Sequence, residues 1–286
     1  MKILISGGTG FIGKYLTEMF RSKDHQVWTV GQSSSNDLQV NLENKCIEIY
    51  NEYDFIIHCA GIVHNQLHAS KIIPELLLRD ILITKNFIKS IKSCEYKKVV
   101  FLSSVAIYGL DSGLNIDEKN IPIPKSGYGI SKFLSEKLFE SAIDNQKLLI
   151  FRMPLVNGPN PKGNIEKLEK AILNGKMILF KNNISKKSLL EVSDLFEMIL
   201  INGIKLFGVF NIKSYDFKFN DFAEKIANRN NKTIIKLPNY ILKILKFVAK
   251  RCSLKTIYMT LSKISNHLTF DNSLLLKKIK ENDKEK

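Results

Sequence analysis

The stretch "KILISGGTGFIG", residues 2–13, decides the fold. It begins with a short apolar run, Lys2–Ser6, which is typical of a buried strand, and Phe11–Arg21 after it has helical spacing. Between them, glycines at Gly7, Gly10 and Gly13 let the backbone turn tightly and approach a diphosphate, whose charge the helix N-terminus would meet. Glycines alone are weak evidence, but glycines between a strand and a helix predict a dinucleotide-binding turn.

The rest of the N-terminal half alternates apolar strands with helices. We expect strands at Gln26–Val30, Asp54–Cys59, Lys98–Leu102 and Leu148–Arg152, and helices at Pro74–Ser93 and Ser126–Ile143. This alternation predicts a parallel sheet covered by helices on both faces, which is the doubly wound α/β fold of Rossmann type.

The pattern changes after Pro154. The stretch "NGPNPKGN", Asn157–Asn164, is rich in turn-forming residues, and beyond it the alternation is lost apart from a strand expected at Gly208–Ile212. We therefore predict a dinucleotide-binding domain over residues 1–155 and a smaller substrate domain over residues 156–286, with some elements of the second packing back on the first. The charged tail, Lys277–Lys286, is expected to be frayed.

Composition indicates a soluble protein of the cytoplasm. Of the 286 residues, 44% are apolar, yet no apolar run approaches the roughly 18 residues of a membrane span, and the first run is too short for a signal peptide. The four cysteines are scattered without a C-x-x-C motif, which favours reduced thiols over disulfides or a zinc site.

The net charge of +15 is unevenly distributed along the chain. Residues 1–160 hold 18 basic and 16 acidic side chains, a balance of +2, whereas residues 161–286 hold 25 and 12, a balance of +13. Any anionic partner would therefore meet the C-terminal half. Nucleic acid is disfavoured as that partner, because arginine is scarce and no recognition motif is present.

The stretch "GYGISKFLSEK", residues 127–137, places Tyr128 and Lys132 on one helix face. A lysine cation beside a tyrosine favours the phenolate, which makes the side chain a usable acid and base. With nine tyrosines and 38 lysines (43 basic residues less five arginines), about one such pair is expected by chance. The pair alone therefore carries no weight.

The position of Tyr128 and Lys132 in the expected fold supports a functional role for the pair. Ligands of a doubly wound sheet lie at the carboxyl ends of the strands, where we expect Ser103–Ser104, His58–Gly61 and Arg152. Tyr128 follows Ser104 by 24 residues, at the start of the next helix. Ser104, Tyr128 and Lys132 are thus predicted to converge where a nicotinamide would lie.

Five motifs together resemble the extended short-chain dehydrogenase/reductases that act on nucleotide sugars. They are "GGTGFIG" (7–13), "DFIIHCAG" (54–61), "SSVAIYG" (103–109), "YGISK" (128–132) and "FRMPLVNGP" (151–159). The resemblance covers roughly residues 1–215 and returns around "LTFDNS", residues 268–273.

The resemblance implies roles for individual residues. Ser104 would position the substrate oxygen, Tyr128 would be the catalytic acid and base, and Lys132 would bind the cofactor ribose and favour the phenolate. The other residues expected to bind NAD or NADP are Gly7, Gly10, Phe11, Ile12, Gly13, Cys59, Ala60 and Gly61. A nucleotide-sugar substrate, a role in bacterial surface polysaccharide biosynthesis and a homodimer are implied in the same way.

The chain also departs from the family pattern. Where many relatives hold the adenosine ribose with an acidic residue, it reads Gly31-Gln32-Ser33-Ser34-Ser35, so the choice between NAD and NADP stays open, although Asn36 and Asp37 could restore a clamp. Asn41 replaces a common aspartate, Asp80 a common asparagine, and Leu155 the asparagine that several epimerases place against the substrate phosphates. The sugar and nucleotide preferences of the relatives therefore do not transfer.

A further departure narrows the chemistry. The 4,6-dehydratases of the family follow the catalytic hydroxyl with Asp-Glu, and this chain has Val105 and Ala106 there, which disfavours dehydration. The leading hypothesis is reduction of a 4-keto nucleotide sugar, and C4 epimerisation is the alternative. A non-catalytic dinucleotide-binding scaffold or sensor is a third reading, against which the intact Ser104, Tyr128 and Lys132 set speaks.

Two other features attract attention. His58, His64 and His68 lie close in sequence, but Gly61 argues for a loop rather than a helix, so no metal site is expected. Residues 240–251, "YILKILKFVAKR", form a basic amphipathic helix that either makes a weak contact with an anionic membrane or packs its apolar side on the core of the substrate domain.

Overall fold

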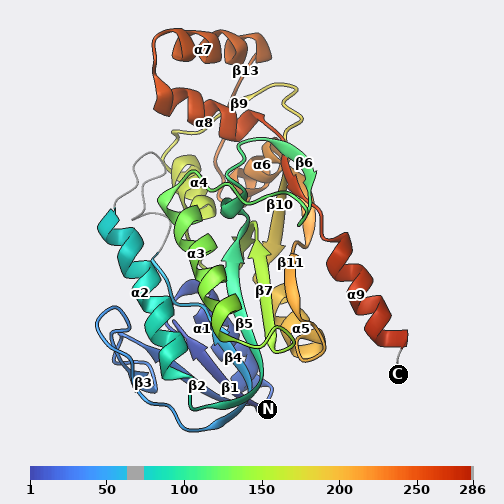
Figure 1. The fold of residues 1–286 in the computed structure, drawn as a ribbon. Helices are drawn as coiled ribbons and strands as arrows, with labels where there is room; N and C mark the ends of the chain where they lie inside the picture. The colour runs from blue at the N-terminus through green and yellow to red at the C-terminus, as the bar shows by residue number, and fades with distance from the viewer. Residues whose placement is uncertain (63–73, 285–286) are drawn as a thin grey trace.

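The computed structural model describes residues 1–62 and 74–284. A parallel sheet of seven strands forms its centre, in the order β11-β7-β5-β4-β1-β2-β3 (Figure 1). The strands are β1 (Lys2–Ser6), β2 (Gln26–Gly31), β3 (Leu38–Gln39), β4 (Glu52–His58), β5 (Glu95–Ser104), β7 (Leu148–Met153) and β11 (Gly208–Asn211). The strand order reverses beside β1, which places the point where ligands bind in such sheets between β1 and β4.

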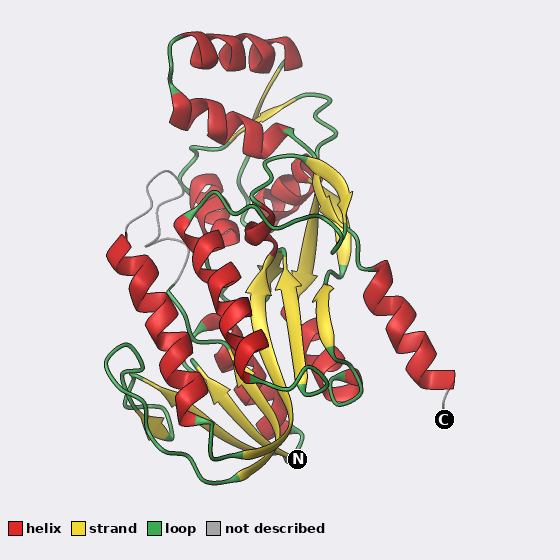
Figure 2. Ribbon diagram, viewed as in Figure 1, coloured by secondary structure: helices red, strands yellow, loops and turns green. Residues whose placement is uncertain are grey.

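Helices cover both faces of this sheet, as predicted (Figure 2). On one face α1 (Phe11–Ser22) and α5 (Val192–Asn202) pack on a core that includes Ile3 and Ile5. On the other face α2 (Pro74–Ser90) and α3 (Gly127–Ala142) pack on a core that includes Leu4. Alternate residues of β1 thus enter opposite cores, which explains why the strand is an unbroken apolar run.

The remaining elements form smaller sheets beyond the carboxyl ends of the central strands. One sheet has the order β12-β10-β14-β6, with β8 also paired to β10, and a second consists of β13 and β9. These strands are β6 (Gly113–Ile116), β8 (Leu155–Asn157), β9 (Ile178–Phe180), β10 (Lys186–Glu191), β12 (Tyr215–Lys218), β13 (Ile235–Leu237) and β14 (Leu268–Phe270). The accompanying helices are η1 (Val105–Tyr108), α4 (Asn164–Leu173), α6 (Phe219–Arg229), α7 (Asn239–Arg251) and α8 (Lys255–Ser265). The last helix, α9 (Ser273–Lys284), packs beside β11 of the central sheet instead.

Two strands pair across the predicted domain division. β11, from the C-terminal half, joins the central sheet beside β7, and β6, from the N-terminal half, joins the smaller sheet beside β14. The division at residue 155 stays a prediction, and these exchanges tie its two sides together.

The tail differs from expectation. Residues 273–284 form α9 instead of a frayed end, because Leu275 is fully buried and Ile279 packs against the same core as α1 and α5. Because Leu275 and Ile279 are four residues apart, they lie on the same face of the helix. The helix expected at Pro74–Ser93 ends at Ser90, and the strand expected at Lys98–Leu102 extends from Glu95 to Ser104.

Candidate active site

The glycine turn between β1 and α1 is closed by backbone contacts. Gly7 has a φ of +70°, in the region that favours glycine, and its carbonyl accepts the Gly10 N–H at 2.9 Å. A Cβ atom at Gly13 would lie 2.2 Å from that same carbonyl oxygen. A Cβ atom at Gly10 would meet only the Gly7 oxygen, at 3.3 Å, among the described residues. Gly13 is therefore required for packing, whereas Gly10 leaves space on the ligand side of the turn.

A cavity of about 560 Å³ opens beside this turn. Of the residues predicted to bind the cofactor, Gly7, Gly10, Cys59, Ala60 and Gly61 line it. The other three predicted residues, Phe11, Ile12 and Gly13, do not line the cavity. They form the start of α1, which follows the turn. The cavity also has lining residues that the sequence analysis did not single out as cofactor-binding, which are Thr9, Gly31, Gln32, Ser33, Val40, Asn41, Leu42, Glu43, Ile62, Arg79 and Ile83. A concave site at a helix N-terminus, floored by glycines, fits a dinucleotide.

The carboxylates nearest the end of β2 are engaged within the protein. Asp37 Oδ2 accepts hydrogen bonds from the Thr29 backbone and hydroxyl at 2.7 and 2.8 Å and from Arg21 at 2.9 Å. Burial opposes ionisation, but the Thr29 hydrogen bonds and the Arg21 charge together lower the pKa of Asp37. Glu43 is held by Arg79 through two contacts of 2.8 Å. Both oxygens of Glu43 therefore have a partner, whereas the contacts of Asp37 are all made through Oδ2, and Asp37 does not line the cavity.

Only the amide nitrogen of the Asn36 side chain is engaged within the protein. Its side chain is buried, and its amide nitrogen donates to the Ser33 carbonyl at 3.0 Å. Asn36 Oδ1, in contrast, is buried with no hydrogen-bond partner among the described residues, so the ribose clamp considered from the sequence stays a prediction for Asn36.

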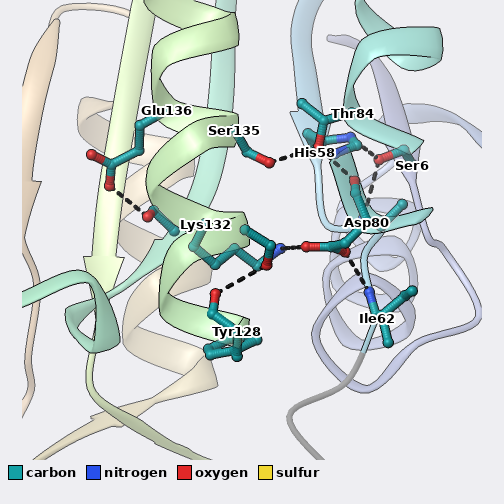
Figure 3. A network of polar contacts seen from close by, with 12 residues as sticks. Ser6, His58, Ile62, Asp80, Thr84, Tyr128, Lys132, Ser135 and Glu136 are labelled. Atoms are coloured by element: carbon teal, nitrogen blue, oxygen red, sulfur yellow. Dashed lines mark hydrogen bonds and ion pairs between the residues drawn. The ribbon is translucent and has the colours of Figure 1, made fainter. Parts of the chain in front are cut away.

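The carboxyl end of β4 is tied to β1 and α2 by a buried histidine. His58 Nδ1 shares a hydrogen bond of 2.7 Å with Ser6 Oγ, and Ser6 Oγ accepts the Ala60 N–H at 3.2 Å (Figure 3). Burial, with the nearby Lys132 charge, holds the pKa of His58 well below its usual range. His58 is thus a neutral structural group. His64 and His68 lie outside the described residues.

Cys59 follows His58 at the cavity wall. Its side chain is half-buried, and burial raises the pKa of its thiol to about 12. The thiol therefore stays protonated, which agrees with a small packing residue rather than a nucleophile.

The catalytic candidates come together at the carboxyl edge of the central sheet. Ser104 ends β5, and its Oγ accepts the Ala106 N–H at 3.2 Å. Ser126 caps α3 by accepting the Gly129 N–H at 3.1 Å, so Tyr128 lies in the first turn of that helix. A Cβ atom at Gly129 would lie 2.6 Å from the Ala106 carbonyl oxygen. This close approach brings the turn that carries Tyr128 against the turn that follows Ser104.

Lys132 lies one helical turn beyond Tyr128 and is nearly enclosed. Its Nζ atom is 5.8 Å from the centre of the Tyr128 ring and 5.6 Å from that of Phe101. Asp80 on α2 faces it, with 3.9 Å between Lys132 Nζ and Asp80 Oδ2 (Figure 3). Asp80 Oδ1 accepts the Ile62 N–H at 2.6 Å. The sequence marked Asp80 only as a departure, whereas the structure makes it the carboxylate facing Lys132.

A second buried ion pair lies further along α3. The Glu136 carboxylate accepts two hydrogen bonds from Arg152, at 2.8 and 3.1 Å, and one from Ser103 Oγ at 2.5 Å. Arg152 Nη1 also donates to the Tyr108 hydroxyl at 3.1 Å. This network holds β5, α3, β7 and η1 together next to Ser104, which ends β5. Arg152, expected at a strand end, therefore supports the site from behind.

The departures at Val105, Ala106 and Leu155 lie at the same edge. Val105 and Ala106 form the start of η1, and Leu155 begins β8, paired with Leu189 of β10.

Within residues 1–62 and 74–284, no group of three or more His, Cys, Asp or Glu side chains is arranged to hold a metal ion. Of the described helices, none is long and apolar enough to cross a membrane.

Two known proteins with similar sequences are named for their action on sugars. The chain is 28% identical over 177 residues to N-acetyl-alpha-D-glucosaminyl-diphospho-ditrans,octacis-undecaprenol 4-epimerase of Escherichia coli O157:H7, covering 58% of the chain and 53% of that protein. It is 34% identical over 149 residues to GDP-L-colitose synthase of Yersinia pseudotuberculosis, covering 49% and 47%. The chain therefore spans about half the length of these relatives.

The fold and the family follow from two further comparisons. A UDP-glucose 4-epimerase of Thermus thermophilus, solved in complex with NAD, superposes with a TM-score of 0.65 over 83% of this chain and 86% of that one, at 19% identity, which shows the shared fold. The model of the NAD dependent epimerase/dehydratase family matches residues 3–204. With most of its length matched and its glycine turn, Tyr128 and Lys132 in place, the chain belongs to the NAD dependent epimerase/dehydratase family.

Proposed function

We propose that this protein reduces the 4-keto group of a nucleotide sugar with NADH or NADPH, in the biosynthesis of a bacterial surface polysaccharide. A nicotinamide dinucleotide bound in the cavity beside the glycine turn would supply the hydride. The chain's own residues would do the rest: Ser104 hydrogen-bonds the keto oxygen, Tyr128 delivers a proton to it, and Lys132 binds the ribose and favours the phenolate left behind. Action at C4 is supported by the names of two similar proteins, both 4-epimerases.

The observation that favours reduction is that Glu43, the carboxylate among the described residues that line the cavity, is already paired with Arg79. A reductase exchanges oxidised for reduced cofactor in every turnover, and a loose hold on the adenosine ribose suits this exchange. Both oxygens of Glu43 accept from Arg79, so this carboxylate would have to break existing contacts to clamp a ribose. Asp37, held by Thr29 and Arg21 through Oδ2, does not line the cavity. Gln32 and Ser33, which line the cavity, offer only neutral hydrogen-bonding groups.

Epimerisation at C4 is the second candidate. It would use the same Ser104, Tyr128 and Lys132, and the names of similar proteins favour it. An epimerase returns the hydride to the same substrate, so it gains from keeping its cofactor bound throughout the cycle. One residue speaks against epimerisation: Leu155, at the start of β8, has no side-chain amide that could hold the phosphates of a keto intermediate.

The experiment that separates the two uses the purified chain. UDP-, GDP- and dTDP-linked sugars and their 4-keto forms are incubated with NADH or NADPH, and the products are identified by mass spectrometry. Reduction predicts little NAD in the purified protein and consumption of one NAD(P)H for each 4-keto sugar converted. Recovery with a full complement of tightly bound NAD, together with epimer interconversion without added cofactor, would overturn the proposal in favour of epimerase.

A further inference from the structure

Helix α7 lies at the end of the molecule farthest from the N-terminus (Figure 1). It packs against α8, and its buried residues are Leu242 and Ala249. Lys246, on the same side, donates to Asn266 Oδ1 at 3.1 Å. These contacts identify the face of α7 that is turned inward.

The opposite face of α7 is apolar and open. Phe247 is 71% exposed, Tyr240 63% and Ile244 55%. At 100° per residue these three lie within about 60° of one another, opposite the side that carries Leu242 and Ala249. The core-packed arrangement considered from the sequence therefore does not describe this helix, because its large apolar side chains face outward. The exposed apolar residues of α7, the following turn and α8, which we call the α7–α8 surface, are Tyr240, Ile244, Leu245, Phe247, Val248, Leu254, Ile257 and Tyr258.

Positive charge surrounds the α7–α8 surface. Residues 225–270 contain ten lysines and arginines and no aspartate or glutamate. Lys243, Lys250, Arg251 and Lys255 are exposed and form no ion pair with any described residue. At 100° per residue Lys243 and Lys250 lie along one side of the apolar strip and Arg251 lies at its end. An apolar strip beside unpaired cations matches a surface that is apolar inside and anionic outside.

We propose that the α7–α8 surface docks on an anionic lipid bilayer, with Phe247, Ile244 and Tyr240 entering the headgroup region and Lys243 and Lys250 contacting lipid phosphates. A second copy of the chain fits this surface poorly, because a two-fold contact would bring two such basic segments together. A bilayer supplies both the apolar depth and the negative charge. The proposal concerns a surface remote from Tyr128 and does not rest on the proposed reaction.

Docking through this surface would set the orientation of the enzyme. β5 and β7 point their carboxyl ends towards the half of the molecule that holds α7 and α8 (Figure 2). The end of the central sheet that carries Ser104 would therefore be turned towards the bilayer rather than towards bulk solution.

The test is sedimentation of the full chain with vesicles. Vesicles of phosphatidylcholine with roughly 30 mol% phosphatidylglycerol should bind it at low ionic strength, whereas pure phosphatidylcholine vesicles should bind it at least about tenfold more weakly. Salt at about 0.5 M should release it, because the Debye length then falls to a few ångström.

Matched variants identify the surface. Ile244→Glu should weaken vesicle binding by at least about tenfold, since it places a charge in the strip that would enter the bilayer. Ile201→Glu is the control, because Ile201 is 67% exposed on α5, away from this surface. The pair Lys243→Gln and Lys250→Gln should weaken binding roughly 30-fold, since each lysine near an anionic surface contributes about 1 kcal/mol. The pair Lys85→Gln and Lys89→Gln on α2 is its control and should change binding less than about threefold.

The outcomes decide the proposal. The proposal is supported if the α7 variants lose vesicle binding and the control variants do not. Intact cofactor binding shows that each variant is folded. Absence of binding to anionic vesicles at low salt overturns it, as does equal loss with Ile201→Glu. A dimer in sedimentation velocity that dissociates on Ile244→Glu, without vesicle binding, would assign the surface to a second copy and also overturn it.

Discussion

Lys132 Nζ lies 3.9 Å from Asp80 Oδ2, and Asp80 is anchored through its other oxygen to the Ile62 N–H at 2.6 Å. Both side chains are almost fully buried. A Cβ atom at Gly61 would lie 2.7 Å from Lys132 Nζ and 2.9 Å from Asp80 Oδ1, so Gly61 is the residue that lets the pair form. Asp80 thus links the loop at the cavity wall to the lysine beside Tyr128.

Replacing Asp80 with asparagine should change the pH dependence of catalysis. An asparagine side chain has the shape of aspartate and can still accept the Ile62 N–H, so Asp80→Asn should fold, but it removes a negative charge beside Lys132. The lysine charge then favours the Tyr128 phenolate more strongly. We expect the tyrosine-dependent limb of the pH profile of kcat/KM to move to lower pH by roughly one unit, the scale of one charge a few ångström away.

Asp80→Leu is the contrasting variant. It loses both the charge and the acceptor, leaving the Ile62 N–H and Lys132 without this partner, and we expect a loss of about 3–5 kcal/mol in the free energy of unfolding. Identical pH profiles for the parent and Asp80→Asn would show that the Asp80 charge does not act on the catalytic tyrosine.

Tyr128→Phe tests the proton transfer directly. Removing the hydroxyl should lower turnover by at least about 10²-fold, the usual scale of general acid catalysis, while NAD(P)H still binds. Tyr240→Phe, on the exposed face of α7, is the matched control and should retain turnover. Near-normal turnover in Tyr128→Phe would remove this residue from the mechanism.

The glycine turn offers a pair of substitutions with opposite expectations. Gly10→Val should fold but lose dinucleotide binding, because its side chain would extend into the space open beside the turn. Gly13→Ala should instead lower the melting temperature, because its Cβ atom would lie 2.2 Å from the Gly7 carbonyl oxygen. Circular dichroism and cofactor fluorescence measure the two effects. Unchanged cofactor affinity in folded Gly10→Val would mean that the diphosphate does not lie at this turn.

Local sequence patterns predicted much of the fold. β1, the glycine turn, α1 and the start of α3 each depend on a few adjacent residues, and their bounds agree with expectation to within about two residues. The family match confirms the resemblance.

Contacts across the fold were not predicted, for a physical reason. Asp80 and Lys132 are 52 positions apart, and they meet because α2 and α3 cover the same face of the sheet. Neither helix carries a local signal for that pairing. Glu136 and Arg152 likewise depend on which strand α3 packs against. In α9 four of the twelve residues are lysines and four are apolar, and the composition alone does not show that Leu275 and Ile279 reach the core.

The Glu136–Arg152 pair should be far more important for stability than its neighbour on the same helix. Glu136→Gln leaves the Arg152 cation buried without a full counter-charge, which should cost about 3–5 kcal/mol in the free energy of unfolding. Glu140 pairs with Lys137 at 2.6 Å in a partly exposed position, and Glu140→Gln should change that free energy by less than about 1 kcal/mol. Denaturant unfolding measures both. Equal effects would show that the buried pair is not a specific stabilising element.

His58 should make the folded state sensitive to mild acid. It is buried and neutral, with its pKa held well below the ordinary value of 6.5 by burial and by Lys132. In the unfolded chain the imidazole binds a proton below pH 6.5, whereas in the folded chain it does not, so falling pH favours the unfolded state. The stability that neutral His58 contributes is therefore complete above pH 6.5 and is lost as the pH falls below it, by about 1.4 kcal/mol between pH 7.5 and 5.5.

Urea unfolding of the parent and of His58→Gln at both pH values measures this loss. The variant should be less stable throughout but should lack this pH-dependent decrease. His267→Gln controls for the loss of an imidazole as such and should retain the parent's dependence. If the parent and His58→Gln lose equal stability between the two pH values, the acid sensitivity originates elsewhere in the chain.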